Sequence, residues 1–311
     1  MLPFKLIYHE RYDLNLGAHV FPSEKYRLIA DRLTNEGLAT LDDFLRPEPA
    51  TDADILRVHT PEWVNKLKTG TLTASDEMKL EVPYSPQLVH AFWLAAGGTT
   101  LAAQAATLDG FGCNIGGGFH HAYPGHGEGF CAIHDVAVAI RKVQAEGTIR
   151  KAMVVDTDVH HGNGTAAIFA HDPSVFTLSI HQWNNYPAHK PPSTVDLNMD
   201  DGAGDEEYLK ALLPAVHDGL EKFHPDMLFY VGGADPYKED QLGGLSLTME
   251  GLKKRDLAVF GEARRVGIPV VITLAGGYAR RVADTVQIHI NTILAAKSIA
   301  EKLSDSRKLS S

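Results

Sequence analysis

The stretch AMVVDTDVHHGNG, residues 152–164, joins a short apolar run to several metal-ligating side chains. A continuously apolar run of this length is typical of a strand buried on both faces of a parallel sheet. Residues i and i+2 of an extended chain point the same way, so Asp158 and His160 can direct an oxygen and a nitrogen at one cation. Two Asp and two His within six residues are costly to bury without a metal or tight pairing. The stretch therefore predicts a metal site at a strand end.

Short apolar runs alternate with amphipathic helical segments along most of the chain. This alternation predicts an α/β fold in which helices cover both faces of a parallel sheet. No repeat or long linker divides the sequence, so we expect one domain over 1–311, with a frayed tail after about residue 303. Ser23 and the Ser85-Pro86 pair are expected helix starts. The predicted strands are 4–8, 111–115, 152–156, 175–180, 227–231 and 269–275, and the predicted helices are 23–35, 86–107, 134–146, 205–222, 248–266 and 283–301.

Composition excludes several classes of protein. A net charge of −10 argues against direct nucleic-acid binding and is compatible with cationic partners such as lysine-rich tails or polyamines. Cys113 and Cys131 are the only cysteines, which excludes a disulfide scaffold and disfavours a cysteine-based zinc site. The sequence has no signal peptide and no apolar run of 18 residues, so we expect a cytoplasmic protein without membrane contact.

A second motif, Gly232-Gly233-Ala234-Asp235, follows the apolar run MLFYV. By itself it is explained more simply as a turn aspartate. Beside the first motif, Asp235 supplies a third ligand for the same cation. Three protein ligands leave one coordination position open, which is the pattern of catalytic rather than structural zinc sites.

Two further motifs follow predicted strands. GGGFHHA, residues 116–122, carries the adjacent imidazoles His120 and His121, which suit acid–base chemistry at neutral pH. Neighbouring side chains diverge in a strand, so both rings can reach one site only if the glycines force a turn. LAGGY, residues 274–278, ends in Tyr278, whose hydroxyl can stabilise an oxyanion. The simpler alternatives are a pair of packing histidines and an exposed loop tyrosine.

Taken in order, GGGFHHA, DTDVHHGNG, GGAD and LAGGY resemble the signature of the metal-dependent histone deacetylase superfamily, which includes acetylpolyamine amidohydrolases and acetoin-utilisation proteins. The likeness runs from about residue 5 to about residue 300 and is nearest in character to short class IV-like bacterial deacylases. It implies an arginase–deacetylase fold, a three-layer α/β/α domain on a largely parallel sheet of roughly eight strands. It also implies hydrolysis of an acyl-amide, either acyl-lysine in a protein or peptide, or an acylated small amine such as an acetylpolyamine.

The resemblance assigns roles to the motif residues. Asp158, His160 and Asp235 would bind Zn²⁺, although this hard ligand set would also accept Fe²⁺ or Mn²⁺. His121 would act as general base, and its neighbour His120 would help to protonate the leaving amine.

Three other residues would complete the catalytic group. Tyr278 would polarise the scissile carbonyl, and Asp156 would pair with His120. Asn163 stands where many deacetylases carry Asp. Its oxygen can still accept a hydrogen bond from His121, but it lacks the charge that would raise the imidazole pKa.

A structural K⁺ site is also implied by the resemblance. It would use Asp156 and the Ser179 hydroxyl together with the main chain of Asp158, His160 and Ile180.

The acyl-lysine channel would be lined by Gly129, Phe130, Phe119 and Leu242. Glu81 lies where relatives carry an acidic residue at the rim. Loop residues that we expect either to shape the entrance or simply to pack are His19, Phe21, Trp183 and Tyr186.

Two other functions compete with this interpretation. Arginase-type chemistry on the same fold needs a two-metal carboxylate set, whereas a histidine pair stands where bridging ligands would be expected. A non-catalytic protein that binds acyl-lysine is the alternative from another class, and the retained histidine pair and Tyr278 disfavour it. The substrate, the preferred acyl length and the oligomeric state are left open by the sequence.

Overall fold

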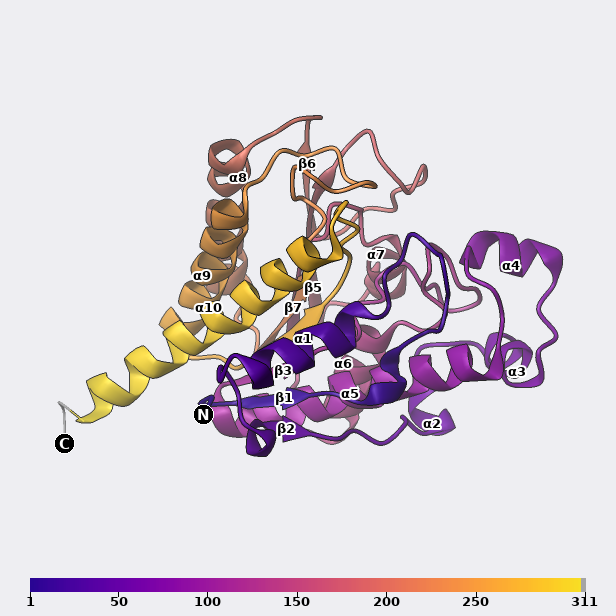
Figure 1. Cartoon of the computed structure of the whole chain (residues 1–311), viewed down its shortest axis with the longest axis horizontal. Helices are drawn as coiled ribbons and strands as arrows, with labels where there is room; N and C mark the ends of the chain where they lie inside the picture. The colour runs from indigo at the N-terminus through magenta and orange to yellow at the C-terminus, as the bar shows by residue number, and fades with distance from the viewer. Residues whose placement is uncertain (309–311) are drawn as a thin grey trace.

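A single parallel β-sheet forms the centre of the molecule, as the computed structural model of residues 1–308 shows (Figure 1). Within these residues the sheet has eight strands in the order β2-β1-β3-β8-β7-β4-β5-β6, and every neighbouring pair is parallel. The strands are β1 (Lys5–Ile7), β2 (Phe44–Leu45), β3 (Phe111–Asn114), β4 (Ala152–Asp156), β5 (Val175–Gln182), β6 (Val195–Met199), β7 (Met227–Gly232) and β8 (Val270–Leu274).

Helices cover both faces of this sheet. One group of buried side chains contains residues of α5, α6 and α7, and a larger group contains those of α1, α8, α9 and α10. Figure 1 shows α9 beside α10, and α5 beside α6. The α-helices are α1 (Lys25–Asn35), α2 (Asp52–Ile55), α3 (Pro61–Thr69), α4 (Ala74–Leu80), α5 (Pro86–Asp109), α6 (Asp135–Ala145), α7 (Asn163–Phe169), α8 (Asp205–Phe223), α9 (Met249–Arg265) and α10 (Val282–Lys308), and short 3-10 turns lie at Glu10–Tyr12 and Leu41–Asp43.

The central strands are buried on both faces, as their apolar runs predict. Val154 and Phe229 belong to the core beneath α5 and α6, while Val155 and Tyr230, the next residues along β4 and β7, belong to the opposite core. A strand with two buried faces has no polar alternation, which is why these strands are recognisable as short apolar runs.

All six predicted strands and all six predicted helices are present, with ends within two residues except that α10 continues to Lys308. The helix start at Ser85 is confirmed, since its Oγ accepts a hydrogen bond from the Leu88 N–H at 3.0 Å. The start at Ser23 is wrong, because α1 is capped at Glu24 and the Ser23 hydroxyl donates instead to Asp13.

The edge strands β2 and β6 and the short helices α2, α3, α4 and α7 were not predicted from the sequence. β2 has two residues, and β6 is only half-buried, so neither gives a continuous apolar run. The tail expected to fray after about residue 303 falls on residues whose side chains are not described, and 309–311 lie outside the described residues. No helix within 1–308 combines the length and apolarity that crossing a membrane requires.

The four sequence motifs meet at one edge of the sheet. β3, β8, β7 and β4 are consecutive neighbours, and the residue pairs Asn114–Thr273, Gly232–Leu274 and Asp156–Val231 hold their carboxyl ends level. In open parallel sheets ligands bind beyond this edge. The topology therefore gathers segments that lie far apart in the chain.

Candidate active site

Asp158, His160 and Asp235 form a buried cluster beyond the ends of β4 and β7. One ligand atom from each residue lies within 4.8 Å of those of the other two. His160 Nδ1 is 3.0 Å from Asp158 Oδ1 and 3.5 Å from Asp235 Oδ2. The structure thus brings together the three residues that the sequence predicts as metal ligands.

Backbone N–H groups fix both carboxylates of this cluster. Gly276 N–H donates to Asp158 Oδ2 at 2.9 Å, and Val159 N–H donates to Asp235 Oδ1 at 2.8 Å. Gly276 must be glycine, because a side chain there would collide with the Asp235 carboxylate. The glycine pair of the LAGGY motif therefore gives the backbone its close approach to the cluster.

The donor set of this cluster fits a divalent cation. Asp235 Oδ2 is buried without a hydrogen-bond partner among the described residues. Burial and the neighbouring Asp158 carboxylate raise the pKa of Asp235 to about 7. Two carboxylates at such close range repel each other unless a positive charge lies between them. A cation bound by Asp158, His160 and Asp235 would remove the repulsion and satisfy the unpartnered oxygen.

The His120–His121 pair lies on a turn made by glycines. Gly117 and Gly118 both have φ of +79°, in the left-handed region that favours glycine. The buried Asp135 accepts hydrogen bonds from the N–H groups of Gly118 (3.0 Å) and Phe119 (2.8 Å), which fixes the turn. The two imidazole rings lie 4.0 Å apart, so the glycine-forced turn required by the sequence argument is present.

His120 is paired with a carboxylate. Its Nδ1 lies 2.7 Å from Asp156 Oδ2, and both side chains are almost fully buried. Burial lowers the pKa of His120, but the charges of Asp156 and Asp158 outweigh burial and raise it to about 9.

His121 is paired with a neutral amide. Its Nδ1 lies 2.6 Å from Asn163 Oδ1, and the Asn163 amide donates in turn to Glu128 Oε1 at 2.7 Å. Burial, with the nearby His120 and His160, holds the pKa of His121 well below its usual range. Burial alone would raise the pKa of Glu128, but hydrogen bonds from His126, Asn163 and Tyr186 lower it.

Tyr278 is held at the same site by its backbone and its ring. Its N–H donates to Asp240 Oδ2 at 2.7 Å, and its ring packs edge-on against those of Phe21 and Phe130, at 6.0 and 6.1 Å. Burial and the charges of Asp158 and its neighbours raise the pKa of the Tyr278 hydroxyl well above 10, so it remains a hydrogen-bond donor.

These side chains border a pocket of about 210 Å³. His121, His160 and Tyr278 all contribute to its wall, so a molecule in the pocket can contact each of them. The other lining residues are Glu81, Gly129, Phe130, Asn185, Tyr186 and Leu242.

Phe119 lies near the predicted channel, on an inner cavity whose lining shares His121, Gly129, Phe130 and Tyr278 with the pocket. It does not line the entrance pocket. Its ring packs against Phe92 of α5, with the ring centroids 4.7 Å apart.

The expected entrance residues divide into two groups. Tyr186 lines the pocket, His19 packs edge-on against Phe130 at 5.1 Å, and Phe21 supports Tyr278. Trp183 lies outside the pocket, where half of its surface is exposed.

The residues of the expected K⁺ site lie side by side. Asp156 and Ser179 are direct partners in the β4–β5 ladder, and Ile180 follows in β5. Asp156 Oδ1 accepts a hydrogen bond from the Asp158 N–H at 3.1 Å, while Ser179 Oγ lies 2.9 Å from His181 Nδ1.

Comparison with known proteins matches the histone deacetylase domain to residues 19–293. The chain belongs to the histone deacetylase family. An uncharacterized protein of Picosynechococcus sp. is 37% identical over 297 residues, which cover 95% of this chain and 99% of that protein. Histone deacetylase 2 of Arabidopsis thaliana is 31% identical over 299 residues, covering 91% of this chain and 77% of that protein. The crystal structure of the HDA15 HD domain has a TM-score of 0.77 at 25% identity and covers 98% of both chains.

This histone deacetylase domain therefore has the arginase–deacetylase fold, as the motif resemblance predicts. Members of the family are metal-dependent deacetylases that act on acylated amines or lysines, and the three-ligand cluster is a candidate for the metal.

Several residues around the candidate site could not be recognised from the sequence. Lys25, the first residue of α1, is fully buried and donates to the Ala275 carbonyl. Burial lowers its pKa to about 8 against the opposing influence of Asp235 and other nearby carboxylates. Asp240, which anchors the Tyr278 backbone, and Glu128 were also missed. A single lysine, aspartate or glutamate carries no signal in the sequence. These three residues are distinguished only by their burial or their hydrogen-bond partners in the structure.

Proposed function

We propose that this chain is a metal-dependent deacylase that removes acetyl or longer acyl groups from lysine side chains. The observation that carries the proposal is the convergence of His121, His160 and Tyr278 on one pocket beside the Asp158–Asp235 carboxylate pair. Amide hydrolysis needs an activated water, a base and an oxyanion donor within reach of one carbonyl.

Asp158, His160 and Asp235 would hold the ion, with Zn²⁺ as our proposal and Fe²⁺ or Mn²⁺ as substitutes. When bound, such an ion supplies Lewis acidity and makes a water molecule acidic enough to lose its proton near neutral pH. The three protein ligands leave a coordination position for this chemistry.

His121 is the general base in this mechanism. Its Nδ1 is engaged by the Asn163 oxygen, so Nε2 keeps a free lone pair with which to take the proton of the attacking water. His120, whose raised pKa keeps it protonated and which Asp156 orients, helps to protonate the leaving amine. Tyr278 donates its hydroxyl hydrogen to the oxygen of the tetrahedral intermediate.

The shape and charge of the pocket suit an acyl-lysine side chain. Gly129, Phe130, Leu242 and the Tyr186 ring offer apolar walls to its methylene groups. Glu81 at the exposed rim would accept hydrogen bonds from the backbone of a peptide substrate. Away from the pocket, Asp156, the Ser179 hydroxyl and the main chain of Asp158, His160 and Ile180 would hold the structural K⁺.

A Tyr278→Phe variant tests the mechanism. We expect the variant to keep its fold and its metal but to lose roughly 10²–10³ in kcat, because one oxyanion donor is removed. Tyr84→Phe, which alters a half-buried tyrosine outside the pocket, is the matched control. A Tyr278→Phe enzyme as active as this control would refute the assigned role.

A panel of substrates tests the specificity. Acetyl-lysine peptide, longer acyl-lysine peptides and acetylputrescine would be compared by kcat/KM. The proposal expects the lysine peptides to be preferred, whereas a preference for acetylputrescine would make the enzyme a small-molecule deacetylase. Stoichiometric binding of peptide without product release would identify a binding protein instead.

A further inference from the structure

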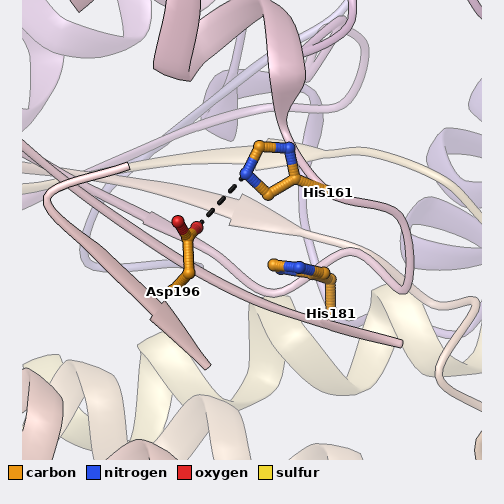
Figure 2. Close-up of side chains that lie close together, drawn as sticks. All are labelled: His161, His181 and Asp196. Atoms are coloured by element: carbon orange, nitrogen blue, oxygen red, sulfur yellow. Dashed lines mark hydrogen bonds and ion pairs between the residues drawn. The ribbon is translucent and has the colours of Figure 1, made fainter. Parts of the chain in front are cut away.

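A second group of metal-ligating side chains lies next to the candidate active site. His161 directly follows the ligand His160, and it is joined by His181 of β5 and Asp196 of β6 (Figure 2). Both imidazoles are fully buried, and about a quarter of the Asp196 side chain is exposed. None of these three residues borders the substrate pocket, so the catalytic mechanism does not use them.

The geometry of this group resembles that of the catalytic cluster. One ligand atom from each residue lies within 4.8 Å of those of the other two. His161 Nε2 is 3.2 Å from Asp196 Oδ1, and the two imidazole rings lie 4.6 Å apart at 77°. Figure 2 shows the Asp196 carboxylate facing the His161 ring, with the His181 ring alongside.

His181 has a buried nitrogen without a partner. Its Nδ1 lies 2.9 Å from Ser179 Oγ, whereas Nε2 is buried and has no hydrogen-bond partner among the described residues. An unpartnered buried imidazole nitrogen is costly unless an ion or a water satisfies it.

We propose that His161, His181 and Asp196 form a second metal site that binds a divalent transition ion, with Zn²⁺ as the expected occupant. Two imidazoles and one carboxylate are a common ligand set for such ions. Ser193 Oγ, 3.4 Å from His161 Nε2, lies where it can contact the fourth ligand, which would be a water. The exposed part of Asp196 gives the ion a route from solvent.

The position of the site indicates a structural role. The ion would join the edge strand β6 to β5 and to the segment that carries His160. The loop between β5 and β6 contains Tyr186, which lines the substrate pocket. An ion at this site would therefore hold a wall of the pocket against the segment that carries a catalytic metal ligand.

Zinc titration of metal-free protein tests the proposal without any measurement of activity. Isothermal titration and elemental analysis of the dialysed protein should give about two Zn²⁺ per wild-type chain. A His181→Gln/Asp196→Asn variant should bind about one, because amide oxygens and nitrogens are poor substitutes for these ligands. An Asp235→Asn variant should also bind about one Zn²⁺. That ion should lie at the His161–His181–Asp196 group, whereas the ion kept by the double variant should lie at the Asp158–His160–Asp235 cluster.

Two controls keep the result interpretable. Asp226→Asn changes a carboxylate that accepts hydrogen bonds from two backbone N–H groups at the opposite edge of the sheet, and it should still bind two ions. If the double variant does not fold, Asp196→Asn alone keeps an oxygen near His161 and should weaken the second binding event at least tenfold. A wild-type chain that binds a single ion, or folded variants of the second group that bind as many ions as the wild type, would overturn the proposal.

Discussion

His120 and His121 are adjacent in the chain and their rings lie 4.0 Å apart, but their hydrogen-bond partners differ in charge. His120 meets the carboxylate of Asp156, with both side chains buried, and its pKa is raised to about 9. His121 meets the neutral amide of Asn163 at the wall of the pocket, and its pKa is lowered. Burial lowers the pKa of both imidazoles, and at His120 the charges of Asp156 and Asp158 outweigh it, so His120 is the ring that holds the proton.

Glu128 completes this difference by fixing the orientation of the Asn163 amide. An ionised carboxylate can only accept, so the amide must turn its NH₂ group to Glu128 and its oxygen to His121. The Gly164 N–H, which can only donate, contacts the same oxygen at 3.1 Å and enforces the same orientation. His121 must then carry its hydrogen on Nδ1, which leaves Nε2 free to act as a base. An aspartate in place of Asn163 would put a negative charge directly beside His121. Here the nearest such charge on this chain of hydrogen bonds is on Glu128, with the Asn163 amide in between.

Asp156→Ala should have the largest effect, because it removes the partner of a buried charged imidazole. Leaving one member of a buried pair alone costs about 3–5 kcal/mol, which urea unfolding would measure. Turnover should fall by about 10³ or more as the His120 ring loses its orientation. Asp226→Ala is the control for the loss of an exposed carboxylate that accepts two backbone hydrogen bonds. A small stability change at Asp156 would show that His120 is neutral in the folded protein.

His121→Ala should lower kcat by roughly 10²–10⁴ with little loss of stability. The contrast with Asp156→Ala arises because His121 borders a pocket that water can fill, so its removal leaves no sealed cavity. Steady-state kinetics and thermal unfolding on the same preparations would measure both. A folded His121→Ala enzyme with near-normal kcat would exclude it as the base.

Asn163→Asp should reduce turnover by about tenfold, even though it brings a negative charge to His121. The new carboxylate would lie against Glu128, and two acidic groups at that range cannot both ionise without cost. Adding Glu128→Gln removes the repulsion and should restore most of the activity. A double-mutant cycle gives the coupling, and additive effects would show that the two residues act independently.

A substitution of His59 should have the smallest effect of these substitutions. It tests whether burial and the hydrogen-bond partners of an imidazole set its pKa at a histidine outside the two metal-ligating groups. Its Nδ1 lies 3.1 Å from the Tyr123 carbonyl oxygen, its Nε2 accepts from the His134 N–H, and burial lowers its pKa to about 4. Between pH 6.5 and 4 the unfolded chain therefore binds more protons, so this contribution to stability is present above pH 6.5 and is lost as the pH falls.

His59→Gln should remove this dependence, because the amide can serve both backbone partners but does not titrate. Between pH 6.5 and 5.5 the wild type should lose about 1 kcal/mol more than the variant, measured by urea unfolding at each pH. Parallel curves for the two proteins would contradict the depressed pKa.

The sequence by itself determined six of the eight strands within residues 1–308 and the candidate catalytic residues. Runs such as 152–156 and 227–231 are apolar enough to be buried on both faces, and a polar motif after each run must emerge at the sheet edge. Asp158, His160, Asp235, the histidine pair and Tyr278 follow from that rule. Half-exposed β6 and two-residue β2 carry too weak a pattern to be found.

Only the tertiary structure decided which side chains from different segments meet. Glu128 reaches Asn163 across 35 residues, Lys25 reaches Ala275 across 250, and Asp196 reaches His161 across 35. The strand order β3-β8-β7-β4-β5-β6 departs from the chain order, so neighbours at the sheet edge are set by packing rather than by sequence spacing. The local sequence pattern predicts which side chains are buried. It does not predict which distant side chain pairs with a buried charged or polar group, because that depends on how the segments pack.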